Sequence, residues 1–445
     1  MKRGQILELF IEDTKYPSIG IAKVGDKTVE IKNALLGSKV LVRITKSKKD
    51  KAEGKILEVL QYPEDAIEPL CPHFEECGGC THQHIPYEFQ LRQKEREVLK
   101  LFTEANIDGF EYEGIEKSPL EFEYRNKMEF TFGNLTKDGE MTLGMHQAGK
   151  FYNIIPIDQC KIADNDYNIL LKVVSDYCKR NELPFYNKMN HEGYLRYLVI
   201  RKSFRRKELL VNIITTSQME HDFSELVDEL LKLELNNKLV GFIHTRNDSL
   251  SDTVKNEGYD VLYGGDYIVE EILGLQFKIS AFSFFQTNSL GAEKLYSVVQ
   301  EYLGNAKRKV VYDLYCGTGT ITQIVSRKAE KVYGIELVKE AIEAARENVK
   351  LNNIDNIQFI VGDVGEKLKE IKDKPDIIII DPPRPGVGPK ALQQIIDFGV
   401  SQMIYVSCNP KTLVENLKAM KKAGYKVGRM RLVDMFPHTV HVECV

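Results

Sequence analysis

The chain has 445 residues, of which 43% are apolar and 28% charged, an ordinary globular composition with room for two or three cores. It contains no apolar run long enough to cross a bilayer and no signal-type apolar segment near its N-terminus, so we expect a cytoplasmic protein. The net charge is -4, but charge is unevenly distributed along the chain: residues 1–60 are basic, with 13 Lys and Arg against 8 Asp and Glu. Eight cysteines in a chain of this length do not make a disulfide framework.

The basic N-terminal part, residues 1–60, predicts a small five-stranded β-barrel. Short runs of alternating apolar and polar residues are separated by Gly and Lys turns, as in barrels that bind nucleic acid. Four lysines fall on one loop, where they either face solvent or contact phosphate groups: Lys46, Lys48, Lys49 and Lys51.

A cysteine cluster follows a Pro- and Glu-bearing linker at residues 62–69. Cys71, Cys77 and Cys80 place three potential thiolate ligands close together, and two glycines between the last two let the backbone wrap tightly. Metal binding is favoured, since clustered thiols have few other uses in a reducing compartment. A fourth ligand is needed, and Cys160 is the nearest candidate in the sequence.

The spacing of these ligands does not identify the metal. Four cysteines suit either zinc or an iron-sulfur cluster. Cys178 is not a candidate ligand, because it falls on the apolar face of a predicted helix. A mixed zinc site would take its last ligand from one of three histidines: His73, His82 and His84.

Residues 61–270 as a whole predict a mixed β domain. A charged amphipathic helix at residues 87–105 is followed by segments that alternate apolar and polar residues between turns. Basic and aromatic residues recur together in these segments, a combination that binds single-stranded RNA through a basic groove and base stacking. The basic residues are Arg125, Lys127, Arg196, Arg201, Lys202, Arg205 and Arg206.

From about residue 277 strands alternate with helices, which predicts an α/β domain with a doubly wound parallel sheet over residues 271–445. The expected strands are 309–314, 331–336, 357–363, 376–381 and 403–406. The expected helices are 291–303, 320–329, 339–352 and 410–416.

A Gly-rich turn, Asp313 to Thr320 (DLYCGTGT), opens the first helix after a strand and brings backbone N–H groups close to a ligand. It lacks both the Gly-x-Gly-x-x-Gly spacing and a Gly-Lys-Ser/Thr clamp, so neither a dinucleotide nor ATP is favoured. Glu336, at the end of the next strand, is placed to accept hydrogen bonds from two ribose hydroxyls. Asp363, one strand further, is placed to bind an adenine amino group.

Three polar positions stand next to apolar runs in this domain. Gln286 and Asn288 follow a Phe-rich run and either contact a ligand or form a polar turn before the next helix. Asp381 ends the run Ile377 to Ile380 and starts an Asp-Pro-Pro sequence, which marks either a tight turn or a polar site.

Cys408 stands at the C-terminal end of the last predicted strand, where Asn409-Pro410 breaks the chain before a helix. Ligands bind at this edge of a doubly wound sheet, and the dipole of the following helix is expected to lower the pKa of the thiol. Cys408 is therefore either a nucleophile or a small buried apolar residue.

These motifs carry a resemblance. Asp313-x-x-Cys-Gly-x-Gly with Glu336 resembles the S-adenosylmethionine site of class I, Rossmann-like methyltransferases. Asp381-Pro-Pro-Arg-Pro-Gly386 and Ser407-Cys-Asn-Pro410 resemble the RNA uracil-5-methyltransferase family. The order of a TRAM-like module, a cysteine-bearing β domain and a catalytic domain is similar to the branch of that family that modifies 23S ribosomal RNA.

The resemblance implies the cofactors and the partner. It implies a 4Fe-4S cluster rather than zinc, held by Cys71, Cys77, Cys80 and Cys160. It implies 23S rRNA as the substrate, because the tRNA-specific bacterial branch typically lacks the TRAM-like module and the cysteine cluster. S-adenosylmethionine would be bound by Gln286, Tyr315, Glu336, Asp363 and Asp381.

The resemblance also implies Cys408 as the nucleophile and Glu443 as the base. The chemistry requires both groups, because thiolate addition at C6 of uracil makes an enolate whose C5 can attack the methyl group of a sulfonium. A carboxylate must then remove the C5 proton before the enzyme–base bond breaks. A target uridine inside folded RNA has to be flipped out to reach the thiol.

Two other classes remain open from the residues. An amino-group methyltransferase would typically have Asp-Pro-Pro-aromatic and no thiol, whereas Arg384 stands at the aromatic position here. A non-catalytic RNA-binding factor would not need Cys408 and Glu443.

Overall fold

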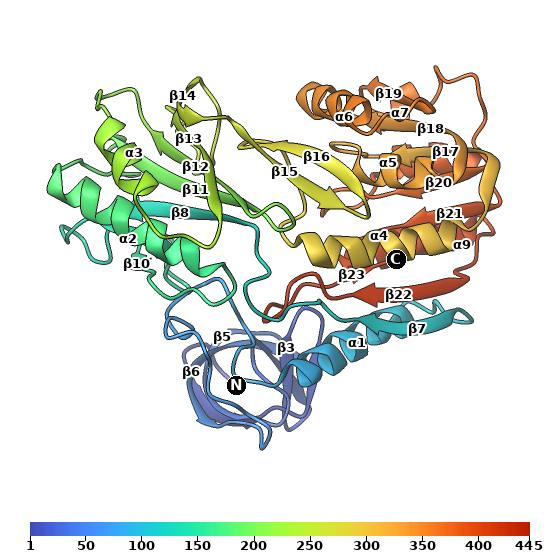
Figure 1. The fold of residues 1–445 in the computed structure, drawn as a ribbon. Coiled ribbons are helices and arrows are strands. Elements are labelled where there is room, and N and C mark those ends of the chain that lie inside the picture. The colour runs from blue at the N-terminus through green and yellow to red at the C-terminus, as the bar shows by residue number, and fades with distance from the viewer.

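Three lobes meet at a common junction in the computed structural model, which describes residues 1–445 (Figure 1). The N-terminal barrel lies at the bottom of the view, the central β domain at the upper left and the C-terminal α/β domain at the right. No helix in the structure is both long enough and apolar enough to span a membrane.

The N-terminal lobe is a six-stranded sheet that curls around its own apolar core (Figure 1). The predicted barrel is confirmed, with one strand more than the five expected because β2 has only three residues. Alternate residues of β4 and β5 point inward, as the pattern predicts. The strands are β1 (Ile6–Phe10), β2 (Asp13–Lys15), β3 (Ile19–Val24), β4 (Lys27–Lys32), β5 (Lys39–Ser47) and β6 (Lys51–Gln61).

The central domain is a seven-stranded sheet in the order β10-β9-β8-β11-β12-β13-β14. It is mixed, as predicted, because β12 and β13 are parallel and the other pairs antiparallel. Helices α2 (Asn165–Arg180) and α3 (Ser224–Leu231) contribute to its core, which includes the fully buried Cys178. The strands are β8 (Lys127–Gly133), β9 (Thr142–His146), β10 (Ile154–Pro156), β11 (Leu195–Ser203), β12 (Glu208–Thr215), β13 (Lys238–Arg246) and β14 (Tyr259–Gly264).

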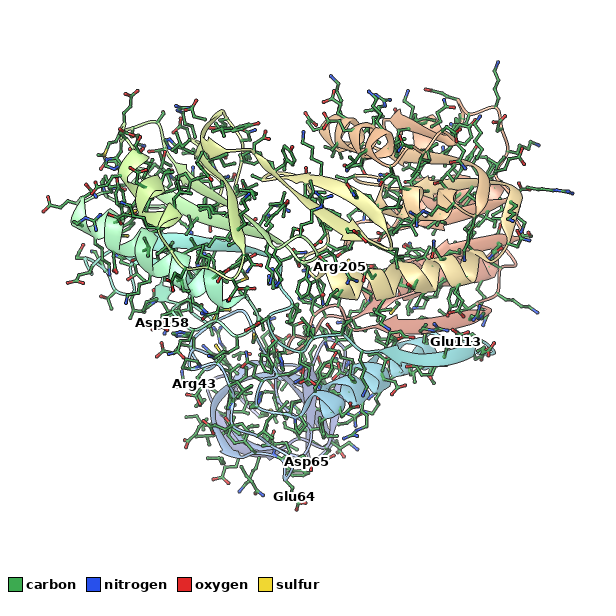
Figure 2. The ribbon with its side chains drawn as sticks, in the orientation of Figure 1. Arg43, Glu64, Asp65, Glu113, Asp158 and Arg205 are labelled. Carbon is green, nitrogen blue, oxygen red and sulfur yellow. The ribbon has the colours of Figure 1, made fainter.

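A hairpin joins the central lobe to the C-terminal one. Its two strands, β15 (Tyr267–Ile272) and β16 (Leu275–Ser280), are antiparallel partners. Leu273 and Gly274 between them both have positive φ, the geometry of a two-residue turn that reverses the chain. An ion pair of 2.8 Å between Arg205, in the β11–β12 turn, and Glu293 fixes the same junction (Figure 2).

The C-terminal lobe contains the predicted doubly wound sheet. Its five strands are all parallel, in the order β19-β18-β17-β20-β21. The four isoleucines of β20 are fully buried, as expected for a strand covered on both faces. The strands are β17 (Ala306–Leu314), β18 (Ala329–Glu336), β19 (Ile357–Val361), β20 (Ile377–Ile380) and β21 (Gln402–Tyr405).

Six helices accompany this sheet. Several predicted elements extended beyond the observed ones: α5 ends at Ser326 rather than residue 329, β19 ends at Val361 rather than residue 363, and β20 spans Ile377–Ile380 rather than residues 376–381. The helices are α4 (Ser289–Leu303), α5 (Thr320–Ser326), α6 (Lys339–Leu351), α7 (Val364–Lys367), α8 (Pro389–Asp397) and α9 (Pro410–Lys422).

A second, three-stranded sheet completes this lobe in the order β23-β22-β7. Strands β22 (Arg429–Val433) and β23 (Glu443–Cys444) come from the C-terminal part of the chain. Strand β7 (Glu111–Glu116) and helix α1 (Tyr87–Glu104) were predicted to belong to the central domain, residues 61–270, but they pack with the C-terminal lobe. Glu113 of β7 forms ion pairs with two arginines of β22, so this early segment is fixed to the C-terminal lobe (Figure 2).

Candidate active site

The predicted nucleophile and base lie opposite each other on adjacent antiparallel segments. Ser407, just after β21, and Cys444 of β23 exchange two backbone hydrogen bonds of 2.9 Å. In an antiparallel pair the next two residues, Cys408 and Glu443, face each other with both side chains on the opposite side of the pair. Residues 35 positions apart are therefore brought together by strand register.

Glu443 is buried rather than exposed near the C-terminus. Its exposed fraction is 5%, and burial raises its pKa to about 7, with the nearby Arg384 guanidinium acting in the opposite direction. A carboxylate that changes protonation near neutral pH is suited to accept a proton during catalysis.

The thiol of Cys408 does not have the lowered pKa that the sequence suggested. Burial raises it to about 11, and the Glu443 and Asp381 carboxylates act in the same direction, while Arg384 partly opposes them. Helix α9 does begin at Pro410 as expected, with Asn409 as its N-cap. The helix start is outweighed first by the burial of the thiol and then by the two acidic groups next to it.

The Asp-Pro-Pro-Arg segment is tied to the loop that carries Cys408. The Arg384 carbonyl accepts hydrogen bonds of 3.1 Å from Asn409 Nδ2 and from Thr412 Oγ1. Gly386 closes the turn with a φ of 78°, and a Cβ there would stand 2.9 Å from Asn416 Oδ1. These contacts fix the Arg384 segment against the start of α9.

Asp381 lies at the end of β20, on the same edge as Cys408. Burial raises its pKa, and the Glu443 and Asp313 carboxylates raise it further, so three acidic groups share this edge. The segment is therefore a polar site as well as a turn, which were the two alternatives left by the sequence.

Glu336 accepts two backbone hydrogen bonds, one of them from the Gly-rich turn. Its Oε2 accepts a hydrogen bond of 3.1 Å from Gly317 N, and its Oε1 accepts one of 2.9 Å from Val338 N. Gly317 has a φ of 53°, and a Cβ there would meet no protein atom within 4 Å, so the turn borders open space. The Oδ1 atom of the buried Asp313 also lacks a hydrogen-bond partner. An open backbone cradle beside a carboxylate suits the ribose and methionine parts of S-adenosylmethionine.

Tyr315 and Asp363 lie at the predicted adenosine end of this cradle. Burial raises the pKa of Tyr315, and the Asp363 carboxylate adds to this effect. Asp363 is exposed and caps α7 by accepting a hydrogen bond of 3.3 Å from Glu366 N. Because Oδ1 of Asp363 accepts this hydrogen bond, its second carboxylate oxygen, Oδ2, is the one left for a ligand.

Gln286 faces the acidic edge, whereas Asn288 does not. Gln286 lies beside Tyr296, whose pKa is raised by burial and by the Asp381, Glu443 and Asp313 carboxylates. Asn288 caps α4, accepting from Gly291 N at 2.9 Å, and donates to the Met435 carbonyl at 2.9 Å. Sequence reasoning missed Tyr296, because a tyrosine on an amphipathic helix looks like any core residue.

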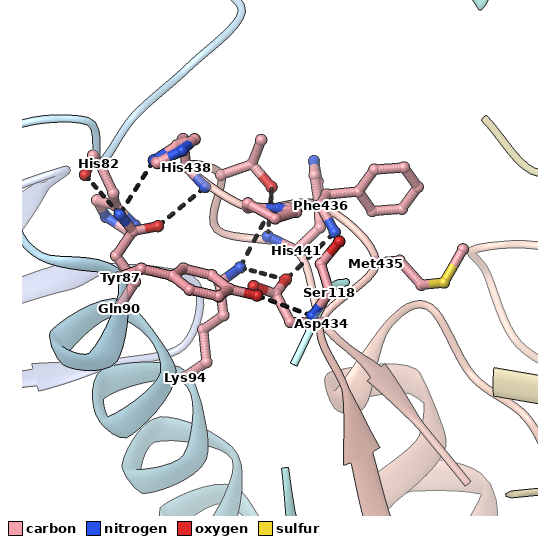
Figure 3. Close-up of polar contacts among 12 residues, drawn as sticks. His82, Tyr87, Gln90, Lys94, Ser118, Asp434, Met435, Phe436, His438 and His441 are labelled. Carbon is pink, nitrogen blue, oxygen red and sulfur yellow. Dashed lines mark hydrogen bonds and ion pairs between the residues drawn. The ribbon is translucent and has the colours of Figure 1, made fainter. Parts of the chain in front are cut away.

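A buried polar network supports the loop that leads to Glu443 (Figure 3). Lys94 of α1 forms an ion pair of 2.8 Å with Asp434 and donates to the Phe436 carbonyl at 3.2 Å. Gln90 accepts a hydrogen bond of 2.9 Å from His438 N and donates to the His82 carbonyl at 3.0 Å. Helix α1 thus connects the cysteine-bearing segment to the catalytic loop.

The four predicted ligand cysteines surround one cavity of about 30 Å³ in the central lobe: Cys71, Cys77, Cys80 and Cys160. Burial raises the pKa of Cys77 to about 11 and that of Cys80 to about 12. No group of three or more His, Cys, Asp or Glu side chains is arranged to hold a single metal ion.

The three histidines considered as zinc ligands are engaged elsewhere. His73 lines the cysteine cavity, but its Nε2 lies 2.8 Å from Asp158 (Figure 2). His82 Nε2 lies 2.8 Å from Ser18 Oγ, and the ring of His84 packs against Phe74. Of the three histidines, only His73 therefore lines the cavity together with the four cysteines.

Part of the predicted basic RNA groove is structural. Arg201 donates to the Ala281 carbonyl at 3.1 Å, and Arg196 donates to the Asn247 carbonyl at 2.6 Å. Lys202 forms an ion pair with Asp164. All three are buried, so they fix loops rather than offer free charge to a phosphate. A separate cavity of about 610 Å³, lined by β21, α9 and β22, contains none of the predicted site residues.

Comparisons with known proteins identify the family of the chain. The model of the tRNA (uracil-5-)-methyltransferase family matches residues 86–445, and that of the TRAM domain matches residues 1–57. Proteins named uncharacterized RNA methyltransferases from Clostridium tetani and Clostridium acetobutylicum are 54% and 53% identical over the whole of this chain and 98% of their own length.

One solved structure is similar over nearly the full length. The tRNA (uracil-54, C5)-methyltransferase of Pyrococcus abyssi, solved with S-adenosyl-L-homocysteine, is 25% identical, with a TM-score of 0.77 over 98% of this chain and 99% of that one. The methyltransferase fold, the N-terminal TRAM domain and the dependence on S-adenosylmethionine are thus established. The chain belongs to the tRNA (uracil-5-)-methyltransferase family, whose members are RNA methyltransferases that use S-adenosylmethionine.

Proposed function

We propose that the protein methylates C5 of a uridine in RNA, with Cys408 as the nucleophile and Glu443 as the general base. The observation that carries this proposal is the register of Ser407 with Cys444, which sets the two side chains opposite each other. The carboxylate is buried and the thiol half-buried, so a flipped base bound between them would be shielded from water.

The reaction runs in two halves. The Cys408 thiolate adds to C6, and C5 of the resulting enolate takes the methyl group from the sulfonium, which leaves as S-adenosylhomocysteine. Glu443 then accepts the C5 proton, and the C6–sulfur bond breaks to return the thiolate. Because the pKa of Cys408 is about 11 in the free protein, the thiol has to lose its proton as the substrate binds. Arg384 is the positive group that favours the thiolate.

The cofactor is proposed to lie along the Gly-rich turn. Glu336 and Asp363 would bind the ribose and the adenine, and Tyr315 would pack beside the adenine. Gln286 and Asp381 stand at the reacting end, where they would contact the methionine part or the uracil edge.

The proposed substrate is 23S rRNA. The support is the combination of the TRAM domain with the cysteine cavity in one chain. A second candidate is tRNA, favoured by the likeness of nearly the whole chain to an enzyme that acts on tRNA uracil-54. That likeness includes the N-terminal part, so the TRAM domain by itself does not exclude tRNA.

A 4Fe-4S cluster is proposed for the cysteine cavity, with Cys71, Cys77, Cys80 and Cys160 as ligands. The donor set fits, because four thiols line one cavity. The cavity is separate from the Cys408–Glu443 pair, so the cluster takes no step in the methyl transfer described above.

Mass-spectrometric mapping of 5-methyluridine in ribosomal and transfer RNA, from cells with and without the gene, tests the proposal. Loss of one or more 23S sites is the expected result. Loss confined to tRNA would select the second candidate, and no loss in either RNA would contradict uridine methylation.

A further inference from the structure

A tyrosine of the N-terminal barrel lies in the core of the C-terminal lobe. Tyr16, between β2 and β3, is only 5% exposed. It is not part of the apolar core of the barrel but packs in the same cluster as Leu413, Val442 and Cys444. The barrel therefore contributes a side chain to the support of the catalytic edge.

The turn that carries Tyr16 is firmly attached to α1. Ser18 N donates to Glu97 Oε2 at 2.9 Å, and Ser18 Oγ lies 2.8 Å from His82 Nε2. Thr14 Oγ1 accepts a hydrogen bond of 2.7 Å from Arg96. The position of the ring is thus set by contacts on both sides of it in the sequence.

Tyr16 lies behind the reacting pair rather than between its members. Cys444 pairs with Ser407 and points away from the side where Cys408 and Glu443 face each other. Tyr16 packs in the core on that rear side, with Lys411 Nζ of the first turn of α9 at 6.0 Å from its ring centre. Burial raises the pKa of Tyr16, and Cys444, Glu443 and Cys408 add to the effect in that order, as expected if the ring is nearest to Cys444.

We propose that Tyr16 is a positioning residue for methyl transfer: its ring supports Cys444 and the start of α9, and through them holds Cys408 opposite Glu443. The barrel then has a role in catalysis that is separate from any contact with RNA. This inference rests on the proposed roles of Cys408 and Glu443.

Steady-state kinetics on purified full-length protein tests it. Tyr16→Ala is expected to lower kcat by about 10- to 100-fold, the effect of a small misplacement of reacting groups, while the KM for RNA and the Kd for S-adenosylmethionine stay unchanged. Tyr16→Phe keeps the ring and is expected to keep kcat. Phe10→Ala is the matched control, because Phe10 is an aromatic residue of the same barrel that is 57% exposed. An unchanged kcat in Tyr16→Ala, or a change in the KM for RNA alone, would overturn the proposal.

A second measurement does not depend on methylation. Site-resolved alkylation with iodoacetamide is expected to leave Cys444 unmodified in the unmutated protein and to label it in Tyr16→Ala. The pH profile of Cys408 alkylation is expected to shift to lower pH in the variant, because water enters around the thiol. If Tyr16→Ala fails to fold, Tyr16→Leu replaces it in both measurements, with the same expected direction. Unchanged alkylation of both cysteines in the folded variant contradicts the positioning role of Tyr16. If alkylation changes but even the unmutated protein makes no 5-methyluridine, only the proposed reaction is contradicted.

Discussion

The donor-binding turn and the reacting pair lie on the same sheet edge but are built in different ways. The turn comes from one short stretch between β17 and α5, and Glu336 reaches it from the next strand. The pair needs the segment after β21 and the two-residue strand β23, which is held in turn by β22 and β7. The first is therefore a local structure, and the second depends on the packing of distant parts of the chain.

The two parts of this edge also differ in how their neighbours affect a negative charge. Around Glu336 the backbone N–H groups of Gly317 and Val338 already satisfy the negative charge. Around Cys408 the neighbours Glu443 and Asp381 oppose a negative charge. The proposed donor site therefore needs no change in charge before it binds its ligand. The Cys408 thiol, in contrast, needs the substrate or Arg384 to stabilise its reactive thiolate form.

Loss of the nucleophile is expected to have the largest effect. Cys408→Ala removes the group that adds to C6, so kcat should fall by about 10⁴-fold or more. RNA and cofactor should still bind, since the donor turn is untouched. Incubation with an RNA containing 5-fluorouridine, followed by a denaturing gel, should give a covalent adduct with the unmutated protein and none with Cys408→Ala. An adduct in the variant would remove Cys408 from the mechanism.

Loss of the base is expected to stall the reaction after methyl transfer. Glu443→Gln should accumulate a methylated protein–RNA adduct and lower turnover by about 10²- to 10⁴-fold, because the C5 proton has no acceptor. In the unmutated protein the base form of Glu443 increases as the pH rises through its pKa of about 7, so resolution of the adduct should speed up over that range. Rapid-quench measurements between pH 6 and pH 8 follow this step. Normal turnover by Glu443→Gln would assign the base to another group.

These two variants concern the part of the site that the sequence described least well. The residue types of Cys408 and Glu443 fit the chemistry, but only a family resemblance connected Glu443 to it. Its burial depends on β22, a strand that the sequence analysis did not identify, and on β7 from more than 300 residues earlier in the chain. The lowered thiol pKa was also wrong, because a dipole argument from adjacent residues includes neither the burial of the thiol nor the Asp381 and Glu443 carboxylates. Glu336 and the Gly-rich turn needed no such long-range information.

The cysteine cavity is a second site assembled over a long distance, since Cys160 joins three cysteines at residues 71–80. Protein purified without oxygen is expected to contain iron and inorganic sulfide. Cys77→Ala or Cys160→Ala should lose most of the iron, measured by elemental analysis. Cys178→Ala is the control, because that thiol is fully buried on α2, away from the cavity. Stoichiometric zinc without iron would contradict the cluster.

The donor side should give a smaller and cleaner effect. Glu336→Ala removes the carboxylate that is placed for the ribose and also releases Gly317 and Val338. Binding of S-adenosylmethionine should weaken by about 2 to 3 kcal/mol, the scale of charge-assisted hydrogen bonds. Calorimetry with S-adenosylhomocysteine measures this without turnover. Unchanged affinity would exclude Glu336 from the cofactor site.

The smallest effect is expected from the lysines at the β5–β6 turn of the barrel. The four lysines predicted for one loop do not all lie on it, because Lys46 belongs to β5 and Lys51 begins β6. Lys46 forms an ion pair with Glu53 at 3.1 Å, so its charge is already balanced. Lys48 and Lys49 lie on the turn between the two strands and have no acidic partner within ion-pair distance. If this loop binds phosphates, replacing Lys48 and Lys49 with Ala should weaken RNA binding equally for all sequences and reduce the salt dependence, by about 0.7 in the log–log slope for each phosphate that is no longer neutralised. Lys46→Ala should change the slope less. Filter binding over a range of salt concentrations measures these slopes. If kcat is unchanged in the same variants, the result separates RNA binding by the barrel from the support that Tyr16 gives to the reacting pair. Equal slopes for the variants of all three lysines would mean that this loop is solvated and does not contact phosphates.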